Sequence, residues 1–161
     1  MVLKPRHPGT QDVLCRHDEE SGTAEAGAIV YLSGDNKVAK VAVSGNVPYA
    51  ILGQRVKAGA TGLPQNFQFP GEIGTADARL GDPVQLFVNG GIFDTNHYIL
   101  PAGVSAGDAL YAQPGEGKLT KVAASGCLGH NGQRLVVAIA QHGLTTDQTA
   151  AGASLLIKLA I

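Results

Sequence analysis

The sequence of 161 residues contains no tryptophan, one methionine and only two cysteines, Cys15 and Cys127. Two cysteines cannot supply the disulfide framework of a small secreted fold, so two buried free thiols are the simpler expectation and a single bridge is the alternative. Aromatic residues make up 5% of the chain, which predicts a thin core of valine, isoleucine, leucine and alanine. A chain of this length buries about 70% of its unfolded surface, so one domain needs neither metal nor disulfide.

Charge is also scarce. Charged residues are 16% of the chain against about a quarter in most domains, and the formal net charge is −1. Binding to nucleic acid or to an anionic membrane needs clusters of lysine and arginine, which this composition argues against. No apolar run approaches the ~20 residues of a membrane span, and residues 1–8 lack the apolar stretch of a signal peptide, so we expect synthesis in a cytoplasm. Low charge also predicts that a partner covers part of the surface.

Sequence motifs for catalysis are missing. The chain has no G-x-S-x-G, phosphate-binding loop, H-E-x-x-H or glycine fingerprint between a strand and a helix. Cys15, His17 and Asp18, or Cys127 with His130, do not have the paired spacing that zinc ligands usually show. We therefore expect no enzyme, no metal and no cofactor.

The strongest positive feature is an internal repeat. Two stretches share one pattern: residues 27–45 (GAIVYLSGDNKVAKVAVSG) and residues 107–126 (GDALYAQPGEGKLTKVAASG). Tyr31 matches Tyr111 at an offset of 80, and after one inserted residue Gly45 matches Gly126 at an offset of 81. Because the insertion falls in a turn and the matches are dense, we interpret the pattern as a duplicated structural unit.

Each copy reads as a β-hairpin. Residues 28–32 are a short apolar run with β-branched and aromatic side chains, residues 33–36 are turn formers, and residues 38–43 alternate in part. A further apolar run ending in glutamine follows each copy, at residues 49–54 and 136–141. Helical periodicity is hard to find, so the sequence predicts an all-β fold, a small β-barrel or β-sandwich.

The predicted organisation has one β domain and an arm. The parts are an extended N-terminal arm at residues 1–26, a β domain at residues 27–161, repeat units at about 27–56 and 107–143, and a long insertion at 57–80. The arm has too little apolar material to offset its ordering entropy, apart from one possible short strand at residues 13–15. It is either a frayed terminus or a segment that orders on a partner. The insertion exceeds the ~15 residues beyond which a loop in a compact domain is usually functional or mobile.

Three stretches together resemble the capsid cement, or head decoration, proteins of tailed bacteriophages: residues 26–40, 45–56 and 81–93. The resemblance implies a small β-barrel or β-sandwich, β-tulip-like, that binds the outside of an icosahedral head between capsomers and stabilises the mature shell. It also implies a virion location, the major capsid protein as partner, and a homo-oligomer, with a trimer favoured over a dimer. Such a structural role involves no catalytic residue, cofactor, nucleic acid or membrane.

Seven residues are the candidates for contact with the capsid: Leu3, Lys4, Arg6, Gln11 and Val13 in the arm, and Phe67 and Phe69 in the insertion. An arm can order across a subunit junction or add a strand to an exposed sheet edge. Phe67 and Phe69 alternate onto one face between two prolines, where they either cap the end of a barrel or anchor an interface.

Three other functions stay open. A carbohydrate-binding β-sandwich would stack sugars on its few exposed aromatic residues: Tyr49, Phe67, Phe69 and Tyr98. A lipoyl or biotinyl carrier needs a lysine at the tip of a tight turn, flanked by the residues that mark the attachment site. Lys118 is not flanked by such residues. The third alternative is the base of a head or tail fibre.

Overall fold

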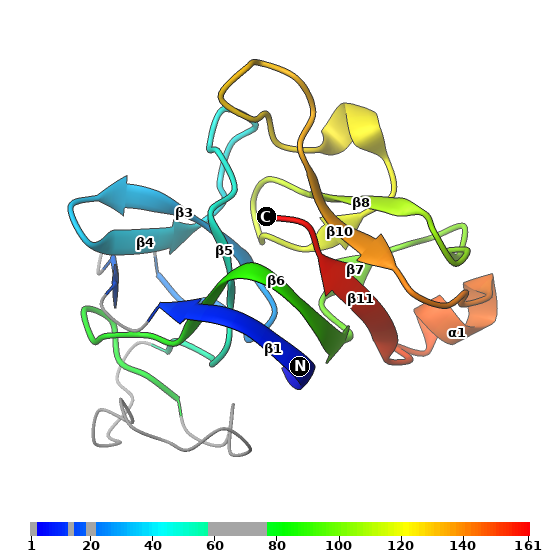
Figure 1. Cartoon of the computed structure of the whole chain (residues 1–161), viewed down its shortest axis with the longest axis horizontal. Coiled ribbons are helices and arrows are strands. Elements are labelled where there is room, and N and C mark those ends of the chain that lie inside the picture. The colour runs from blue at the N-terminus through cyan, green and yellow to red at the C-terminus, as the bar shows by residue number, and fades with distance from the viewer. Residues whose placement is uncertain (1–2, 13–14, 19–21, 58–76) are drawn as a thin grey trace.

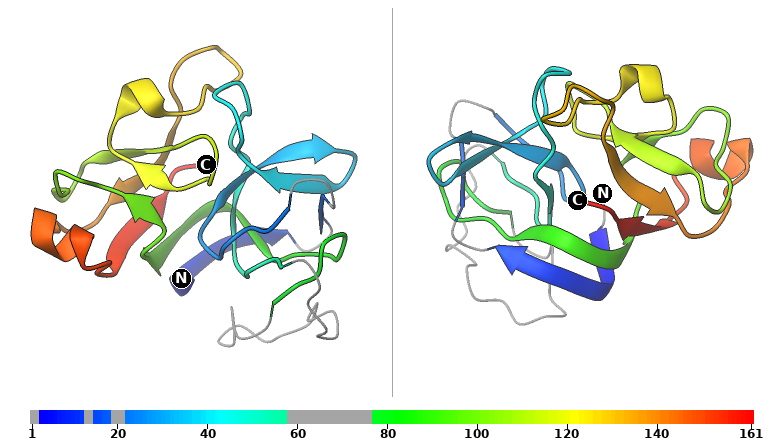
Figure 2. Two further views of the ribbon diagram at one scale, coloured as in Figure 1. Left: turned by 180° about the vertical axis from the view of Figure 1, so that it is seen from behind. Right: turned by 45° about the horizontal axis from the view of Figure 1, so that its top comes forward.

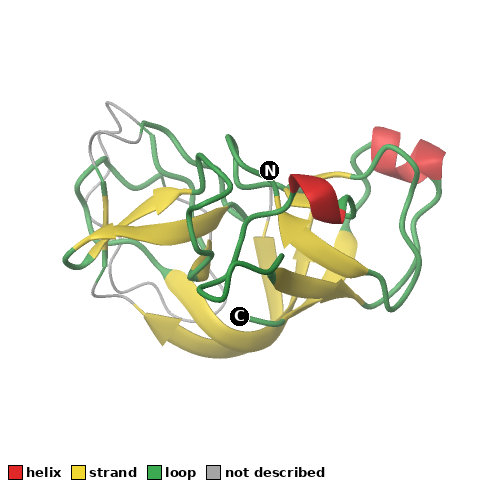
Figure 3. Ribbon diagram, turned by 90° about the horizontal axis from the view of Figure 1, so that it is seen from above, coloured by secondary structure: helices red, strands yellow, loops and turns green. Residues whose placement is uncertain are grey.

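The computed structural model describes residues 3–12, 15–18, 22–57 and 77–161, and strands and loops make up nearly all of this part (Figure 1, Figure 3). The strands are β1 (Leu3–Asp12), β2 (Arg16–His17), β3 (Ile29–Gly34), β4 (Lys37–Lys40), β5 (Ala50–Leu52), β6 (Leu86–Thr95), β7 (Tyr98–Ile99), β8 (Ala109–Ala112), β9 (Leu119–Thr120), β10 (Val136–Ala140) and β11 (Leu155–Leu159). Helix in the described ranges is limited to a 3-10 turn, η2 (Ala123–Ser125), and one short α-helix, α1 (Thr146–Ala150). The prediction of a mostly-β fold is confirmed.

The strands form one mixed sheet. Ten of them follow a single path of hydrogen-bonded neighbours, β2-β4-β3-β5-β6-β11-β10-β8-β9-β7, and β1 lies beside this path, paired with β6. The outermost pairs, β2 with β4 and β7 with β9, are parallel. The sheet is not closed into a barrel, so that part of our prediction is wrong. Its end strands, β2 and β7, are only two residues long, which is too short for a continuous closing seam.

The strand order contains the same unit twice. Read from either end, the path passes through equivalent strands, β2/β7, β4/β9, β3/β8 and β5/β10, and the two units meet where β6 pairs antiparallel with β11. The correspondence extends to single residues: Tyr31 pairs with Ala39, and Tyr111 pairs with Thr120. We call β2 to β6 the first lobe and β7 to β11 the second lobe. The two lobes are thus related by an approximate two-fold axis within one chain.

Strand β6 joins the two lobes. Along one edge, β5 pairs with its first residues and β11 with its last residues. β1 pairs along the other edge of β6 (Figure 1). Phe93, for example, has Pro5 of β1 as its partner on one side and Ile157 of β11 on the other. Midway, Gly90 and Gly91 have φ of 64° and 97°, values that glycine adopts readily, so the strand can change direction between the lobes.

Alternation along the strands separates two hydrophobic cores. In β3, Ile29 points into the larger core and Val30 into the smaller one. In β6, Leu86 belongs to the smaller core, whereas Phe87 and Phe93 lie in the larger core with ring centroids 4.8 Å apart. The larger core takes residues from both lobes, and the smaller core belongs to the first lobe. The core is therefore aliphatic, as expected, around one central pair of phenylalanines.

The second hairpin inserts its tip into the first lobe. The backbone N–H of Ile29 donates to the carbonyl of Gly117 at 2.8 Å, and the N–H of Gly115 donates to the carbonyl of Val41 at 2.9 Å. The tip of the first hairpin instead stays within its own lobe, where Arg16 N–H donates to the carbonyl of Asn36 at 2.8 Å. This difference breaks the two-fold relation and fastens the lobes together.

The first residues of the chain differ from our prediction of an arm. Leu3–Asp12 is a strand of ten residues, paired along its length with β6, rather than a segment that is frayed or orders only on a partner. The physical reason is that β6 offers a complete edge of backbone donors and acceptors, and pairing with them does not require an apolar sequence. Register shifts at Pro5/His7 and Thr10/Gln11 accommodate the local irregularity of the sequence.

Candidate functional site

The predicted contact residues in the described part of the arm lie on β1. Leu3 is 2% exposed and packs in the larger core, so its side chain stabilises the chain itself. Arg6 is exposed, and its Nε donates to Asp94 Oδ2 at 2.6 Å, which balances its charge within the chain. The backbones of Lys4 and Gln11 pair with Asp94 and Phe87 of β6. The structure therefore brings these four residues together on one edge strand.

The remaining predicted contacts, Val13, Phe67 and Phe69, lie outside the described residues. The two ends of the long insertion are placed, however. Val56 forms a bridge with Ala78, and Lys57 N–H donates to the carbonyl of Ala78 at 3.0 Å.

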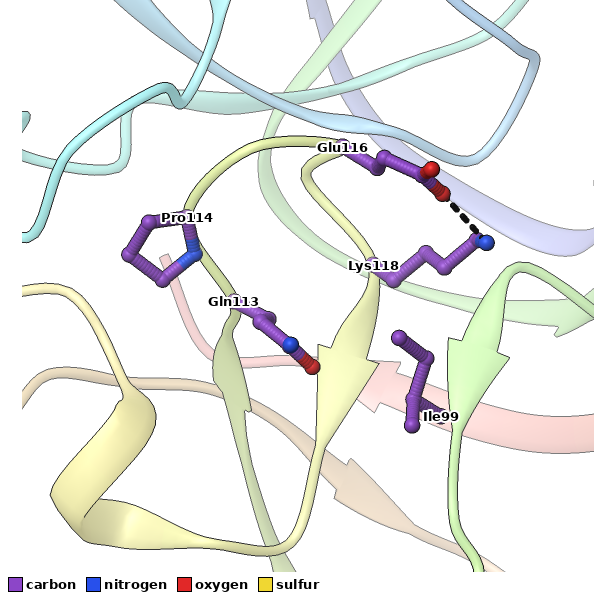
Figure 4. A pocket seen from close by; sticks show the side chains of 5 residues that line it. All are labelled: Ile99, Gln113, Pro114, Glu116 and Lys118. Carbon is purple, nitrogen blue, oxygen red and sulfur yellow. Dashed lines mark ion pairs between the residues drawn. The ribbon is translucent and has the colours of Figure 1, made fainter.

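A polar hollow lies where the tip of the second hairpin meets the first lobe. It has a volume of about 300 Å³ and is lined by Thr23, Ala24, Glu25, Lys40, His97 and Glu116. A neighbouring hollow shares Glu116, whose carboxylate forms an ion pair with the ammonium group of Lys118 (Figure 4). The hydrogen bond between these two side chains lowers the pKa of the Glu116 carboxyl group. Charges of both signs therefore balance here, which leaves little net attraction for a charged ligand.

Two buried histidines have lowered pKa values. Burial disfavours the charged imidazolium, and it lowers the pKa of His17 and of His97 below the ordinary value of 6.5. His97 is 2% exposed, and its Nε2 lies 3.1 Å from the carbonyl oxygen of Glu116. The charged groups that act on His97 are Lys118, Glu25 and Glu116, and Lys40 lines the same hollow.

We expect the folded state to lose stability as the pH falls below about 6.5. The unfolded chain takes up a proton on each histidine before the folded chain does, so acid favours unfolding by up to about 1.4 kcal/mol per pH unit for each histidine. The variant His97→Gln should show a shallower loss in urea unfolding between pH 5 and 6.5, whereas Val122→Ala, at an exposed position without a titratable group, should keep the parent slope. The same slope for His97→Gln and the parent would contradict this assignment. The pKa values of Asp108 and Glu116 are lowered, so these carboxylates affect the stability of the fold only at a lower pH than the histidines do.

The two cysteines are buried and are not joined in a disulfide, as expected. Cys15 lies in the smaller core and Cys127 in the larger core. Burial raises the pKa of Cys127 to about 11, so its thiol is not a nucleophile at neutral pH. Within the described ranges, no group of three or more histidine, cysteine, aspartate or glutamate side chains is placed to hold a metal ion.

A third hollow, which the sequence did not predict, opens beside Tyr31 in the first lobe. It has a volume of about 370 Å³ and is lined by Tyr31, Leu32, Gly45, Asn46, Val47, Pro48, Tyr49 and His130. We call it the tyrosine pocket. Leu32 is 50% exposed at its rim, and neighbouring Val43 is 59% exposed. The pocket therefore combines half-buried aromatic rings with exposed apolar side chains.

Of the four aromatic residues proposed as sugar platforms, the structure describes two. Tyr49 lines the tyrosine pocket. Tyr98 is 9% exposed, and its hydroxyl donates to the carbonyl of Ala153 at 2.6 Å, so it is part of the core and not an exposed platform. The signal that could have pointed to the pocket is the contrast between the repeats, since Asn46 follows Gly45 where the buried Cys127 follows Gly126.

No protein-family model matches the chain, and no curated protein matches it at a significant level. Among the described residues, no helix has both the length and the apolar character needed to cross a membrane.

Proposed function

We propose that this chain is a structural virion protein that binds the outer surface of an icosahedral bacteriophage head between capsomers and stabilises the mature shell. The proposal starts from the sequence resemblance, whose three stretches include β3, β4, β5 and most of β6. These strands form the sheet of the first lobe and the strand that joins the lobes. The resemblance therefore involves the framework of the fold, and we propose that the two lobes face one another as a β-sandwich across the larger core.

The observation that carries the proposal is the open edge of β1. This ten-residue strand pairs with β6 on one side, and no described strand pairs with the other. The free backbone groups of such an edge can accept a strand from another chain. Pro5 and Pro8 lack an N–H, and the register shifts interrupt the strand, which limits the partner to a short segment. The edge is therefore better suited to pairing with one short segment of a shell subunit than to continued strand-to-strand aggregation of copies of this chain.

Binding of this kind stabilises a shell through differential affinity. If the protein binds the mature lattice and not its precursor, each site gains about 2.7 kcal/mol when the free protein is at a hundredfold excess over Kd. An oligomer that contacts several capsomers raises the effective concentration of each contact. We propose a homotrimer that binds the major capsid protein, in which every copy presents its β1 edge.

The test is electron microscopy of heads assembled with and without the polypeptide, together with its mass in solution. We expect density on the outer surface at positions between capsomers, earlier loss of DNA on heating when the protein is absent, and a mass near three times the 16.5 kDa of one chain. Heads that bind none of the protein would overturn the proposal.

A pair of variants examines the role of the β1 edge. Lys4→Glu combined with Gln11→Glu places negative charge along the strand, and we expect about tenfold weaker binding to heads, or ~1.4 kcal/mol. Lys37→Glu, at an exposed position of β4, is the matched control and should bind as the parent does. Equal binding by both variants would show that another surface makes the contact.

A further inference from the structure

The tyrosine pocket differs sharply from its counterpart in the second lobe. A Cβ atom placed on Gly126 would lie 2.7 Å from Cβ of Tyr111, so in the second lobe the loop lies directly against the tyrosine. A Cβ placed on the matching Gly45 would have no atom within 4 Å. The space beside Tyr31 is therefore open because the loop after β4 does not close over it.

The loop of the first lobe is held in this open position. Asn46 Oδ1 accepts hydrogen bonds from the backbone N–H groups of Ala42 at 2.9 Å and Val43 at 3.0 Å. The carbonyl of Ser44 accepts a hydrogen bond from the N–H of Leu128 at 2.8 Å, which joins the loop to the second lobe. Figure 1 and Figure 2 show the loop after β4 and the loop between η2 and β10 side by side, at the end of the molecule away from β1. The pocket is thus a built feature at the contact between the lobes.

The pinned amide of Asn46 leaves donors available for a ligand. Because the two backbone N–H groups fix Oδ1, they also fix the direction of Nδ2, which has two N–H donors. Among the described residues, neither this Nδ2 nor the hydroxyl of Tyr31 has a hydrogen-bond partner. The pocket therefore presents polar groups of fixed position beside the apolar faces of Tyr31 and Tyr49.

This lining selects a neutral ligand that has both hydroxyl groups and apolar faces. Among the residues that the structure describes, no aspartate, glutamate, lysine or arginine lines the pocket, so these residues offer a phosphate or carboxylate no counter-charge apart from the exposed ring of His130. The volume of about 370 Å³ is at the lower end of small-molecule pockets, which hold mainly apolar side chains and a few placed polar groups. We propose that the tyrosine pocket binds a neutral saccharide, with a sugar ring against the tyrosines and a hydroxyl accepting from Asn46. This proposal goes beyond shell binding and does not depend on it.

The test is a nuclear magnetic resonance titration of the full chain with glucose, galactose, N-acetylglucosamine and oligosaccharides that contain them. The chain has four tyrosines and no tryptophan, so the ring signals of Tyr31, Tyr49, Tyr98 and Tyr111 can be followed individually. We expect at least one of these sugars to shift the signals of Tyr31 and Tyr49 saturably, with those of Tyr98 and Tyr111 unchanged.

Variants then link the binding to the named groups. Asn46→Asp keeps the acceptor for both backbone N–H groups but removes both donors, and we expect at least tenfold weaker sugar binding with the same thermal unfolding. Tyr49→Ala should also weaken binding at least tenfold. Tyr31→Phe should bind more weakly than the parent, whereas Tyr111→Phe, the matched change in the second lobe, should bind like the parent.

Three outcomes would overturn the proposal: no saturable shift with any sugar tested, shifts centred on Tyr98 or Tyr111, or saturation of the pocket only by a neutral proline-rich peptide included in the same titrations. The loop after β4, which lines the pocket, lies at the end of the molecule away from β1 (Figure 1, Figure 2), so failure here would leave the measured binding to heads unchanged.

Discussion

Replacing Phe93 by alanine is expected to lower the free energy of unfolding by about 3–5 kcal/mol, the range observed for large aromatic residues in cores. Its side chain is fully buried, and its ring contacts that of Phe87 at a centroid distance of 4.8 Å. Phe93 also lies on the strand that both lobes share, between β1 and β11. The cavity would therefore loosen both lobes. Urea unfolding, followed by circular dichroism, measures the change.

Two further variants make the Phe93 result specific. Phe93→Leu keeps much of the volume and should cost less than the alanine change. Val122→Ala removes apolar atoms from a residue that is 51% exposed, and it should stay within about 0.5 kcal/mol of the parent. If Phe93→Ala were as stable as Val122→Ala, the central position of this ring in the core would be wrong.

The second large effect is expected at the tip of the second hairpin, where Gly117→Ala should destabilise the protein by about 3 kcal/mol or more. A Cβ there would lie 2.5 Å from the carbonyl oxygen and 3.0 Å from the nitrogen of Ile29. Both atoms belong to the backbone of β3, so no side chain can move aside. The tip must shift, and the hydrogen bond from Ile29 N–H to the carbonyl of Gly117 is then lost. Thermal and urea unfolding give the magnitude.

The control for Gly117 is Gly132→Ala. The two glycines have similar φ, 67° and 71°, but a Cβ on Gly132 would have no atom within 4 Å. This variant should therefore show only the cost of the left-handed backbone, about 1–2 kcal/mol. Equal losses at the two positions would mean that the tip of the second hairpin is not held tightly against Ile29.

Much of the fold could be predicted from local sequence. The apolar runs with glycine at their ends predicted the strands of both hairpins, and the matched tyrosines predicted that Tyr31 and Tyr111 occupy equivalent positions. The sequence does not predict that the repeat extends to β2 and β7, because each strand is only two residues long. Their residues also differ: His17 of β2 and Tyr98 of β7 occupy equivalent positions in the sheet. Their equivalence follows from what they pair with and not from their own side chains.

The strand β1 shows a second limit of sequence reasoning. The low apolar content of residues 1–26, together with their prolines and charges, predicts an arm. The strand forms because it supplies main-chain hydrogen bonds to β6, a partner more than 70 residues away in the sequence. On this strand, Leu3 is 2% exposed and packs in the larger core.

The tyrosine pocket was only half predictable. Tyr49 was among the aromatic residues considered for sugar binding, but Tyr98 proved to be buried, and Tyr31 and Asn46 were missed as candidates. Their role depends on whether a loop closes over a tyrosine, and the sequence contains the same serine and glycine at that point in both copies. The neighbouring residue, asparagine or cysteine, decides the difference through hydrogen bonds that only the structure shows.

The presence of both lobes in one polypeptide has a consequence for how such a molecule can change. In a symmetric pair of identical subunits, every substitution appears twice, so a change that opens a cavity on one side also opens it on the other. Here the two lobes are different stretches of one chain, so each can accept mutations that the other would not tolerate. One half is thereby free to acquire a recognition surface while the other preserves the packing that keeps the whole molecule folded.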